Sequence, residues 1–446
     1  MKDSYKITLS PFEVELFDTK RQWAVFICVC VLVFALHLYQ EYMQYSAYTA
    51  PTHTQELYAQ VIAQYTKSKQ SSNGAKSTYK VLKLKTSNGA VFYTTSKEDI
   101  KDISHRFVRI YGKRLECSFA QYLKSCFFIS YRISLLPEYD YRQGVREWID
   151  SQHQESLVAA LYKTLFMADF LPHIWRDLSN KLGVAHLIAI SGFHLGILSF
   201  VIGGLLSLIY GRFHRFVSYR NKYFDIGFLV LVCLFGYLIV LDFSPSFLRS
   251  FVMAMCGFFV VYSGIRLISF KLLFVVVCVC LALFPRLIFS IGFALSISGV
   301  FFIYLFVRYF HFSGGLWHKI VFMPLSFNTL IFIDMLPLVH WFFPYFTPLS
   351  LLAIPISLIF VIFFPLMLVA HIFGFGWICD EFFLWIKDKQ INAITFYTPL
   401  WFICGYGILC MWAIYSKRAY YVIYCMSIAF FAYLIVQFYE SGLSLW

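Results

Sequence analysis

Long apolar runs separated by short polar links make up the second half of the chain. They cover residues 184–209, 225–241, 247–264, 270–284, 287–307, 318–343, 350–373, 394–415 and 419–438. A helix needs about 20 apolar residues to cross a bilayer, so most of these runs are long enough to span one. With the run at 23–40, the pattern predicts about ten hydrophobic segments in a polytopic α-helical membrane protein.

The run at 23–40 is expected to be a transmembrane anchor. Its apolar part ends at Tyr39, and Gln40 and Glu41 follow, where a cleaved signal peptide would show small residues. Lys20 and Arg21 precede it, and basic residues favour the cytoplasmic side. Residues 1–22 are therefore predicted to be a cytoplasmic N-terminus, and the segment after the anchor is predicted to lie outside.

Residues 44–140 follow a strand pattern instead of a membrane pattern. Two β-rich runs flank residues 87–89, whose Ser-Asn-Gly sequence is typical of a hairpin turn. Further strands are predicted within 105–119 and 125–133, whereas residues 55–74 look helical and then loose. A small extracytoplasmic β-barrel of about five strands fits this segment.

Residues 141–182 place apolar side chains at helical spacing among charges. This spacing predicts amphipathic helices on the membrane surface, and a soluble linker helix is the alternative. The remainder, residues 183–446, is expected to be the multi-helix membrane domain.

Composition supports a membrane protein and adds a basic bias. Hydrophobic residues are 60% of the chain and charged residues 14%, with a formal net charge of +13. Residues 51–150 hold sixteen Lys and Arg against nine Asp and Glu, which is more than half of the excess. Basic loops also follow from the positive-inside rule, but this concentration in one polar segment favours a polyanionic partner.

Three stretches resemble the ComEC family of competence proteins. They are AHLIAISGFHLGIL at 185–198, SPSFLRSFVMAM at 244–255 and FPRLIFSIGFALSISGVFFI at 284–303, and they occur in the family's order. The resemblance implies a bacterial inner-membrane channel that takes up single-stranded DNA in natural transformation. It also implies that the outer barrel is OB-like. The chain resembles a short form without the metallo-β-lactamase-like domain of larger members.

The first stretch carries polar residues into an apolar segment: His186, Ser191, Gly192 and His194. On one continuous helix the two histidines would lie about 80° apart, facing broadly the same way. A metal pair is disfavoured because no acidic residue accompanies them. Ser191 with a distant His340 or His371 could form a hydrolase dyad. The bland alternative is close helix packing, which is compatible with a channel lining.

The second and third stretches complete the predicted path with Ser246, Arg249, Ser296 and Ser298. Serine caps and an arginine at a helix start suit a phosphate contact. The alternative is that Arg249 snorkels to the interface with Asp242 as its partner. The remaining deep charges, Asp334 among them, are expected to be paired or interfacial.

The outer domain supplies the predicted DNA-binding residues. Period-2 spacing puts Phe107, Arg109 and Tyr111 on one strand face, and Lys83 and Lys85 on another. Interleaved rings and cations suit single strands, and an ordinary sheet with its aromatics in the core is the alternative. The other candidates are Arg106, Lys113 and Arg114. Cys117 and Cys126 are a candidate disulfide outside the cytoplasm.

Absent motifs limit the chemistry. The sequence has no Walker-type phosphate loop and no His-x-His-x-Asp-His motif, so neither an enzyme activity nor a cofactor or metal is predicted. The expected partners are single-stranded DNA, the lipid bilayer, a periplasmic DNA receptor, and a cytoplasmic ATPase or strand-binding proteins, with a homo-oligomer left open. A small-solute permease and an intramembrane hydrolase centred on Ser191 are the alternative functions.

Overall fold

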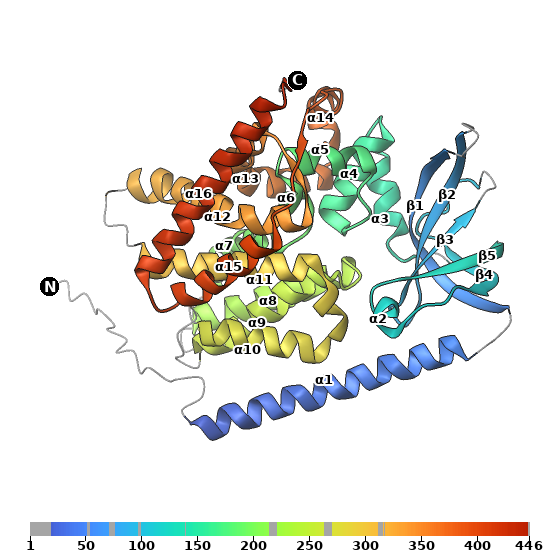
Figure 1. Ribbon diagram of the computed structural model, residues 1–446, viewed down its shortest axis with the longest axis horizontal. Helices are drawn as coiled ribbons and strands as arrows, with labels where there is room; N and C mark the ends of the chain where they lie inside the picture. The colour runs from blue at the N-terminus through green and yellow to red at the C-terminus, as the bar shows by residue number, and fades with distance from the viewer. Residues whose placement is uncertain are drawn as a thin grey trace.

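The computed structural model describes residues 19–50, 54–70, 76–96, 100–138, 140–213, 221–262, 270–310, 315 and 317–444. A small β-barrel lies beside a bundle of helices, and one long helix, α1 (Lys20–Thr49), runs along the bundle toward the barrel (Figure 1). Most of the predicted cytoplasmic N-terminus lies outside the described residues.

Five strands close the barrel in the order β1-β2-β3-β5-β4. They are β1 (Gln55–Gln70), β2 (Lys76–Lys85), β3 (Val91–Ser96), β4 (Phe107–Arg114) and β5 (Cys126–Leu135). Among the described strands, only β3 and β5 pair in parallel, an arrangement that agrees with the predicted OB-like barrel. The helical prediction for 55–74 is wrong over residues 55–70, because pairing with both β2 and β4 holds them extended, and residues 71–74 lie outside the described residues.

The predicted hairpin joins β2 to β3. Gly89 adopts a φ of +75°, which an L side chain rarely accepts, and its N–H donates to the Thr86 carbonyl at 2.9 Å. The antiparallel register then pairs Lys85 with Val91. The turn residues therefore fix which side chains of β2 and β3 lie on the outside of the barrel.

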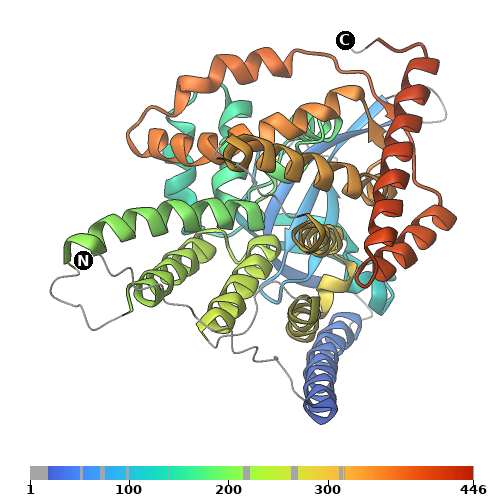
Figure 2. The ribbon, with the colours of Figure 1, turned by 90° about the vertical axis from the view of Figure 1, so that its left-hand side faces the viewer.

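The outer end of α1 packs on the barrel. Tyr45 donates its hydroxyl hydrogen to the Cys117 carbonyl at 2.9 Å, and the Tyr48 ring lies 5.0 Å from that of Phe92. Near the same end, Glu41 forms an ion pair with Arg286 of the bundle. Figure 2 shows α1 at the edge of the bundle, with the strands behind the helices. α1 thus links the barrel to the helical domain.

Each of the ten predicted hydrophobic segments contains a long helix. Besides α1 they are α7 (Gly192–Phe213), α8 (Lys222–Val240), α9 (Pro245–Tyr262), α10 (Phe270–Leu283), α11 (Ile291–Tyr309), α12 (Met323–Phe342), α13 (Ala353–Ile372), α15 (Leu400–Ala413) and α16 (Lys417–Glu440). Within the described residues, seven helices are long and apolar enough to cross a membrane, while α9, α10 and α15 are shorter. The chain is a polytopic helical membrane protein with a small β-barrel.

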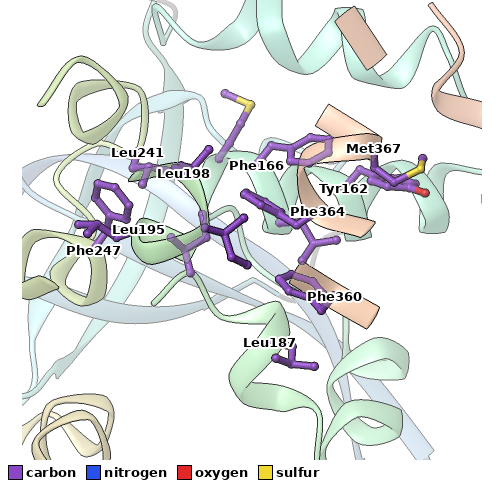
Figure 3. Packing of buried hydrophobic residues seen from close by; sticks show 14 of the residues in the cluster. Tyr162, Phe166, Leu187, Leu195, Leu198, Leu241, Phe247, Phe360, Phe364 and Met367 are labelled. Carbon is purple, nitrogen blue, oxygen red and sulfur yellow. The ribbon is translucent and has the colours of Figure 1, made fainter. Parts of the chain in front are cut away.

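The segment predicted to lie on the membrane surface forms α3 (Gln143–Asp150), α4 (Ser156–Met167) and α5 (His173–Lys181). α4 is not a surface helix, because eight of its residues are buried. In Figure 3, Tyr162 and Phe166 of α4 meet Phe364 and Met367 of α13. The expected amphipathic layer is instead partly incorporated into the core, since apolar faces of α13 and α14 (Asp380–Lys387) cover α4.

A two-stranded bridge closes the segment that contains α13 and α14. β6 (Tyr345–Phe346) pairs with β7 (Ile394–Thr395), so the two ends of residues 347–393 lie side by side. At the other end of the bundle, the Tyr309 hydroxyl donates to the Ala413 carbonyl at 2.7 Å. Lys417 and Arg418 therefore lie near the end of α11, where Arg308 also lies, so these basic residues gather at one end of the bundle.

Candidate functional site

The helix predicted for 184–209 is broken. α6 (Ala185–Ile188) ends before an extended Ala189, and α7 starts at Gly192. Ser191 caps α7, since its Oγ accepts the N–H of Phe193 at 3.3 Å, while the ring of His194 accepts the Ser191 N–H at 3.3 Å. These contacts satisfy amides that a helix start leaves free.

The two histidines do not lie on one continuous helix, because the extended residues separate α6 from α7. Both rings nevertheless face α13, as the expectation of a broadly common direction implies. His194 is fully buried, with ring centroids 5.1 Å from Phe360 and 4.8 Å from Phe364. His186 remains exposed, and its Nε2 lies 3.4 Å from Ser357 Oγ.

Three helices begin close to one another around Arg249. A Cβ at Gly192 of α7 would lie 3.0 Å from Oγ of Ser250 in α9, so these two starts are in close contact. The Arg249 guanidinium contacts Ser246 Oγ at 3.3 Å, and a Cβ at Gly292 of α11 would lie 3.8 Å from the same guanidinium. Helix starts carry partial positive charge, so this group of residues favours an anion.

Arg249 is a buried cation without an acidic partner. Its exposed fraction is 4%, and its guanidinium lies 5.3 Å from the Phe293 ring. Its Nε has no hydrogen-bond partner, and no carboxylate in the described parts of the chain pairs with it. The alternative in which Arg249 snorkels with Asp242 as partner is wrong, because Asp242 pairs with Lys85 and Arg142. An unpaired charge in such a place points to a function.

Ser296 and Ser298 lie deeper in α11, within two turns of Phe293, and both are half-buried. Ser298 donates its hydroxyl hydrogen to the Ala294 carbonyl at 2.9 Å. Because the two serines are two residues apart on one helix, they point to different faces of α11 and do not form one polar row with Arg249.

On the barrel, β4 alternates as its period-2 spacing predicted. Arg109, Tyr111 and Lys113 are exposed and Phe107 is half-buried, while the intervening positions are buried. Arg109 lies 3.9 Å from a carboxylate oxygen of Glu56, which partly neutralises this face. The face presents rings and cations to the outside.

Of the other predicted DNA-binding residues, two form contacts within the fold and one lies half-buried at the end of a strand. Lys85 forms an ion pair with Asp242 at 2.9 Å. Arg106 donates to the Leu136 carbonyl at 3.4 Å, so both residues hold the fold together. Arg114 is half-buried at the end of β4.

A second group of rings and cations joins the predicted DNA-binding residue Lys83 to three residues that the sequence did not single out. Tyr65 of β1 stacks on Phe170 with centroids 6.0 Å apart and planes 9° apart, and the Arg176 guanidinium lies 4.4 Å from the Phe170 ring. Lys83 lies near the same arginine. Tyr65 stood in a segment read as helical, and Phe170 and Arg176 in a linker, so only the fold brings them together.

The charges of this group are unusual. Burial, and secondly the nearby Arg176 guanidinium, lower the pKa of the Lys83 amine. In the part of the chain that the structure describes, no carboxylate forms an ion pair with Lys83 or Arg176. We refer to Tyr65, Lys83, Phe170 and Arg176 as the outer seat. Two cations and two rings without an acid suit a phosphate backbone with stacked bases.

Within the part of the chain that the structure describes, Asp334 is neither paired with a cation nor exposed at an interface, so that expectation is wrong. It is 1% exposed in α12, and Tyr420 donates to its carboxyl oxygen at 3.3 Å. The Tyr406 hydroxyl donates to its backbone carbonyl at 2.7 Å and contacts Ser427 Oγ at 2.9 Å. Hydroxyl groups of α15 and α16 therefore take the place of an ion pair.

Cys117 and Cys126 are joined by a disulfide, with their Cα atoms 6.0 Å apart. Across the described residues, no group of three or more His, Cys, Asp or Glu side chains is arranged to hold a metal ion.

The fold and these polar groups define a class of protein: a multi-pass membrane protein with a small barrel that carries exposed rings and cations, and a buried cation among its helices. The profile of the family described as Competence protein matches residues 168–402, a little over half of the chain. The chain belongs to this family, the ComEC/Rec2 competence proteins, and membership indicates a role in DNA uptake during natural transformation. No curated protein and no solved structure matches the chain.

Proposed function

We propose that this protein conducts single-stranded DNA across the bacterial inner membrane. The observation that carries the proposal is Arg249, a buried guanidinium with no carboxylate partner among the described residues. A cation of this kind is costly unless an anion visits it. The phosphates of a passing strand are the anions that membership of a DNA-uptake family suggests.

The outer seat is the proposed point of arrival. Stacking on Tyr65 and Phe170 would hold bases of any sequence, and Lys83 and Arg176 would attract the backbone. The exposed face of β4, with Arg109 and Tyr111, offers a second contact. A single strand would then pass the starts of α7, α9 and α11, where the Arg249 group lies.

The contacts of Ser191 favour a helix cap over a hydrolase nucleophile, because His194 Nδ1 accepts the Ser191 N–H and Ser191 Oγ accepts the Phe193 N–H. The Ser191 hydroxyl lies 3.4 Å from His194 Nδ1 in this cap. The two histidines considered as distant bases have other surroundings: His371 contacts His153 and the Met367 carbonyl, and His340 lies among Phe346 and Phe430.

DNA import by Arg249→Gln tests the proposal. In a deletion strain that carries the variant, labelled DNA should still bind outside but reach the cytoplasm at least about 10-fold less, because phosphates lose a desolvated cation worth over 1 kcal/mol. Arg308→Gln is the matched control, since Arg308 is exposed at the far end of α11. Equal import by both variants, at equal membrane levels, would contradict the proposed path.

A further inference from the structure

Two buried imidazoles face each other at the junction of the outer helices and α13. His153, in the link between α3 and α4, places its Nε2 3.1 Å from Nε2 of His371, in the last turn of α13. The His153 side chain is fully buried and His371 is 1% exposed. None of the residues assigned above to the path or the outer seat belongs to this pair.

The outer nitrogens of both rings contact acceptors. His371 Nδ1 lies 2.7 Å from the Met367 carbonyl, which can only accept, so this nitrogen carries a hydrogen. His153 Nδ1 lies 2.8 Å and 3.1 Å from the two carboxylate oxygens of Asp380, so a hydrogen lies between them as well. Placing that hydrogen on the carboxyl instead leaves the number of protons unchanged.

The inner contact needs one more proton. If both rings were neutral with hydrogens on Nδ1, two lone pairs would face each other at 3.1 Å. A hydrogen bond at this distance requires that one Nε2 donates. The two rings then hold three protons on four nitrogens, and Asp380 balances the single positive charge. A bridging metal is not indicated, since among the described residues no third ligand joins these two imidazoles.

We propose that His153, His371 and Asp380 bind one exchangeable proton, and that this proton latches the α3–α4 link onto α13 and α14. Gln152 strengthens the same junction, because its amide donates to the His371 carbonyl at 3.1 Å and accepts the Gly376 N–H at 3.0 Å. When the shared proton leaves at higher pH, the facing lone pairs repel and the junction opens. A Cβ at Gly376 would lie 2.8 Å from His371 Nε2, so little space remains for a water in place of the proton.

The groups around the pair leave Asp380 as its one charged contact within the described structure. Tyr162 of α4 stacks on His153 at 4.8 Å and lies 4.6 Å from His371, and the Phe166 ring lies 4.9 Å from His371. Trp148 of α3 is 6.4 Å from His371. Cys379, which precedes α14, contacts Met367 through its thiol at 3.8 Å. The tyrosine hydroxyl and this thiol are the other titratable groups, and neither is charged near neutral pH.

The latch is connected to both parts of the proposed path. α3 carries Arg146, which binds Asp140 at the base of the barrel, and α13 carries the Phe360 and Phe364 rings around His194. Its consequence for transport rests on the proposed function, whereas its proton does not. External pH would thereby adjust how the barrel is mounted on the helices.

Two measurements on the full-length protein in detergent, without DNA, test the latch. Nitrogen NMR of labelled histidines should show one imidazolium and one neutral ring for this pair near about pH 6. Hydrogen exchange of residues 148–156 and 371–380, corrected for intrinsic rates, should be faster by at least about 10-fold at about pH 8.5 than at pH 6. Two neutral rings beside an ionised Asp380 carboxylate near pH 6 would overturn the proposal, because the extra proton would then be absent.

Variants of the two histidines test the proposal independently of the NMR measurement. His153→Gln and His371→Gln should remove the pH dependence of exchange, at whichever level of protection each variant shows. His173→Gln, an exposed histidine on α5, should keep it. A pH dependence that persists in both latch variants would overturn the proposal. DNA import by the wild-type chain is scored separately, so a failure of the transport function leaves these outcomes readable.

Discussion

Lys85 of the barrel places its Nζ 2.9 Å from Oδ2 of Asp242, in the turn between α8 and α9. The contact joins the outer domain to the membrane domain beside the start of α9, the helix that carries Arg249. It also changes the interpretation of Lys85, since a lysine that faces the bundle cannot lie on the free surface of the barrel.

Lys85→Gln should therefore weaken the attachment of the barrel to the helical domain more than it weakens DNA binding. The two side chains are 37% and 39% exposed, so the pair contributes at most roughly 1 kcal/mol after screening by solvent. A double-mutant cycle with Asp242→Asn, read by thermal unfolding, should give a coupling of this size. Loss of strand affinity as large as that caused by Lys83→Gln would contradict this assignment.

Lys83→Gln and Arg176→Gln should each lower the affinity for single-stranded DNA. Each phosphate contact contributes about 0.7 to the slope of log affinity against log salt, so each variant should reduce that slope by about this amount. Lys181→Gln is the control, because Lys181 is already paired with Asp177 at 2.8 Å. Binding of a labelled oligonucleotide by the full-length protein at several salt concentrations measures the slopes. Unchanged slopes in both variants would contradict DNA binding at the outer seat.

Arg109→Gln should have a smaller effect than either of those changes, because Glu56 lies 3.9 Å from the Arg109 guanidinium. The same salt series tests this ranking. A larger loss for Arg109→Gln would move the main contact to the face of β4.

Acid should weaken the contacts of Asp140 that attach the barrel to α3. Burial of Asp140 opposes its charge, but hydrogen bonds and attraction from Arg142 and Arg146 prevail and hold its pKa well below the usual 3.8. The deprotonated form is therefore favoured by folding, so this stabilisation is present above about pH 4 and is lost as the pH falls below it. Unfolding temperatures of the wild type should decline over that acid range, and Asp140→Asn should be less stable at neutral pH but decline less. An equal decline in the variant would contradict this role.

Ser191→Ala should separate a helix cap from a nucleophile. Removing a serine cap costs about 1 kcal/mol, so the variant should melt at a slightly lower temperature and import DNA within a few-fold of wild type. Normal folding with complete loss of activity would instead support the hydrolase alternative. Expression, melting temperature and import are measured on the same preparation of cells.

Sequence patterns predicted the membrane helices because lipid imposes the same apolar length on each of them. They also predicted the β2–β3 hairpin, since Gly89 supplies the turn's unusual φ. β1 was missed because its Ala and Gln residues have weak strand preference, and pairing on both sides holds it extended.

The site was predicted in part. The motifs identified Arg249 and the helix starts. They did not show that Arg249 has no carboxylate partner among the described residues, because Asp242 is close to it in sequence but pairs with Lys85 and Arg142. The outer seat joins Tyr65 to Phe170 across a hundred residues, and no local pattern reports such a contact. The break at 189–191 was missed because apolar Ile190 continues the hydrophobic run.

The most direct test of the central claim is DNA uptake by a deletion strain, scored for labelled DNA held outside the inner membrane and labelled DNA delivered to the cytoplasm. The account predicts that the deletion strain retains bound DNA outside, delivers none inside, and regains delivery when the wild-type chain is restored. Delivery at wild-type levels in the deletion strain would contradict it.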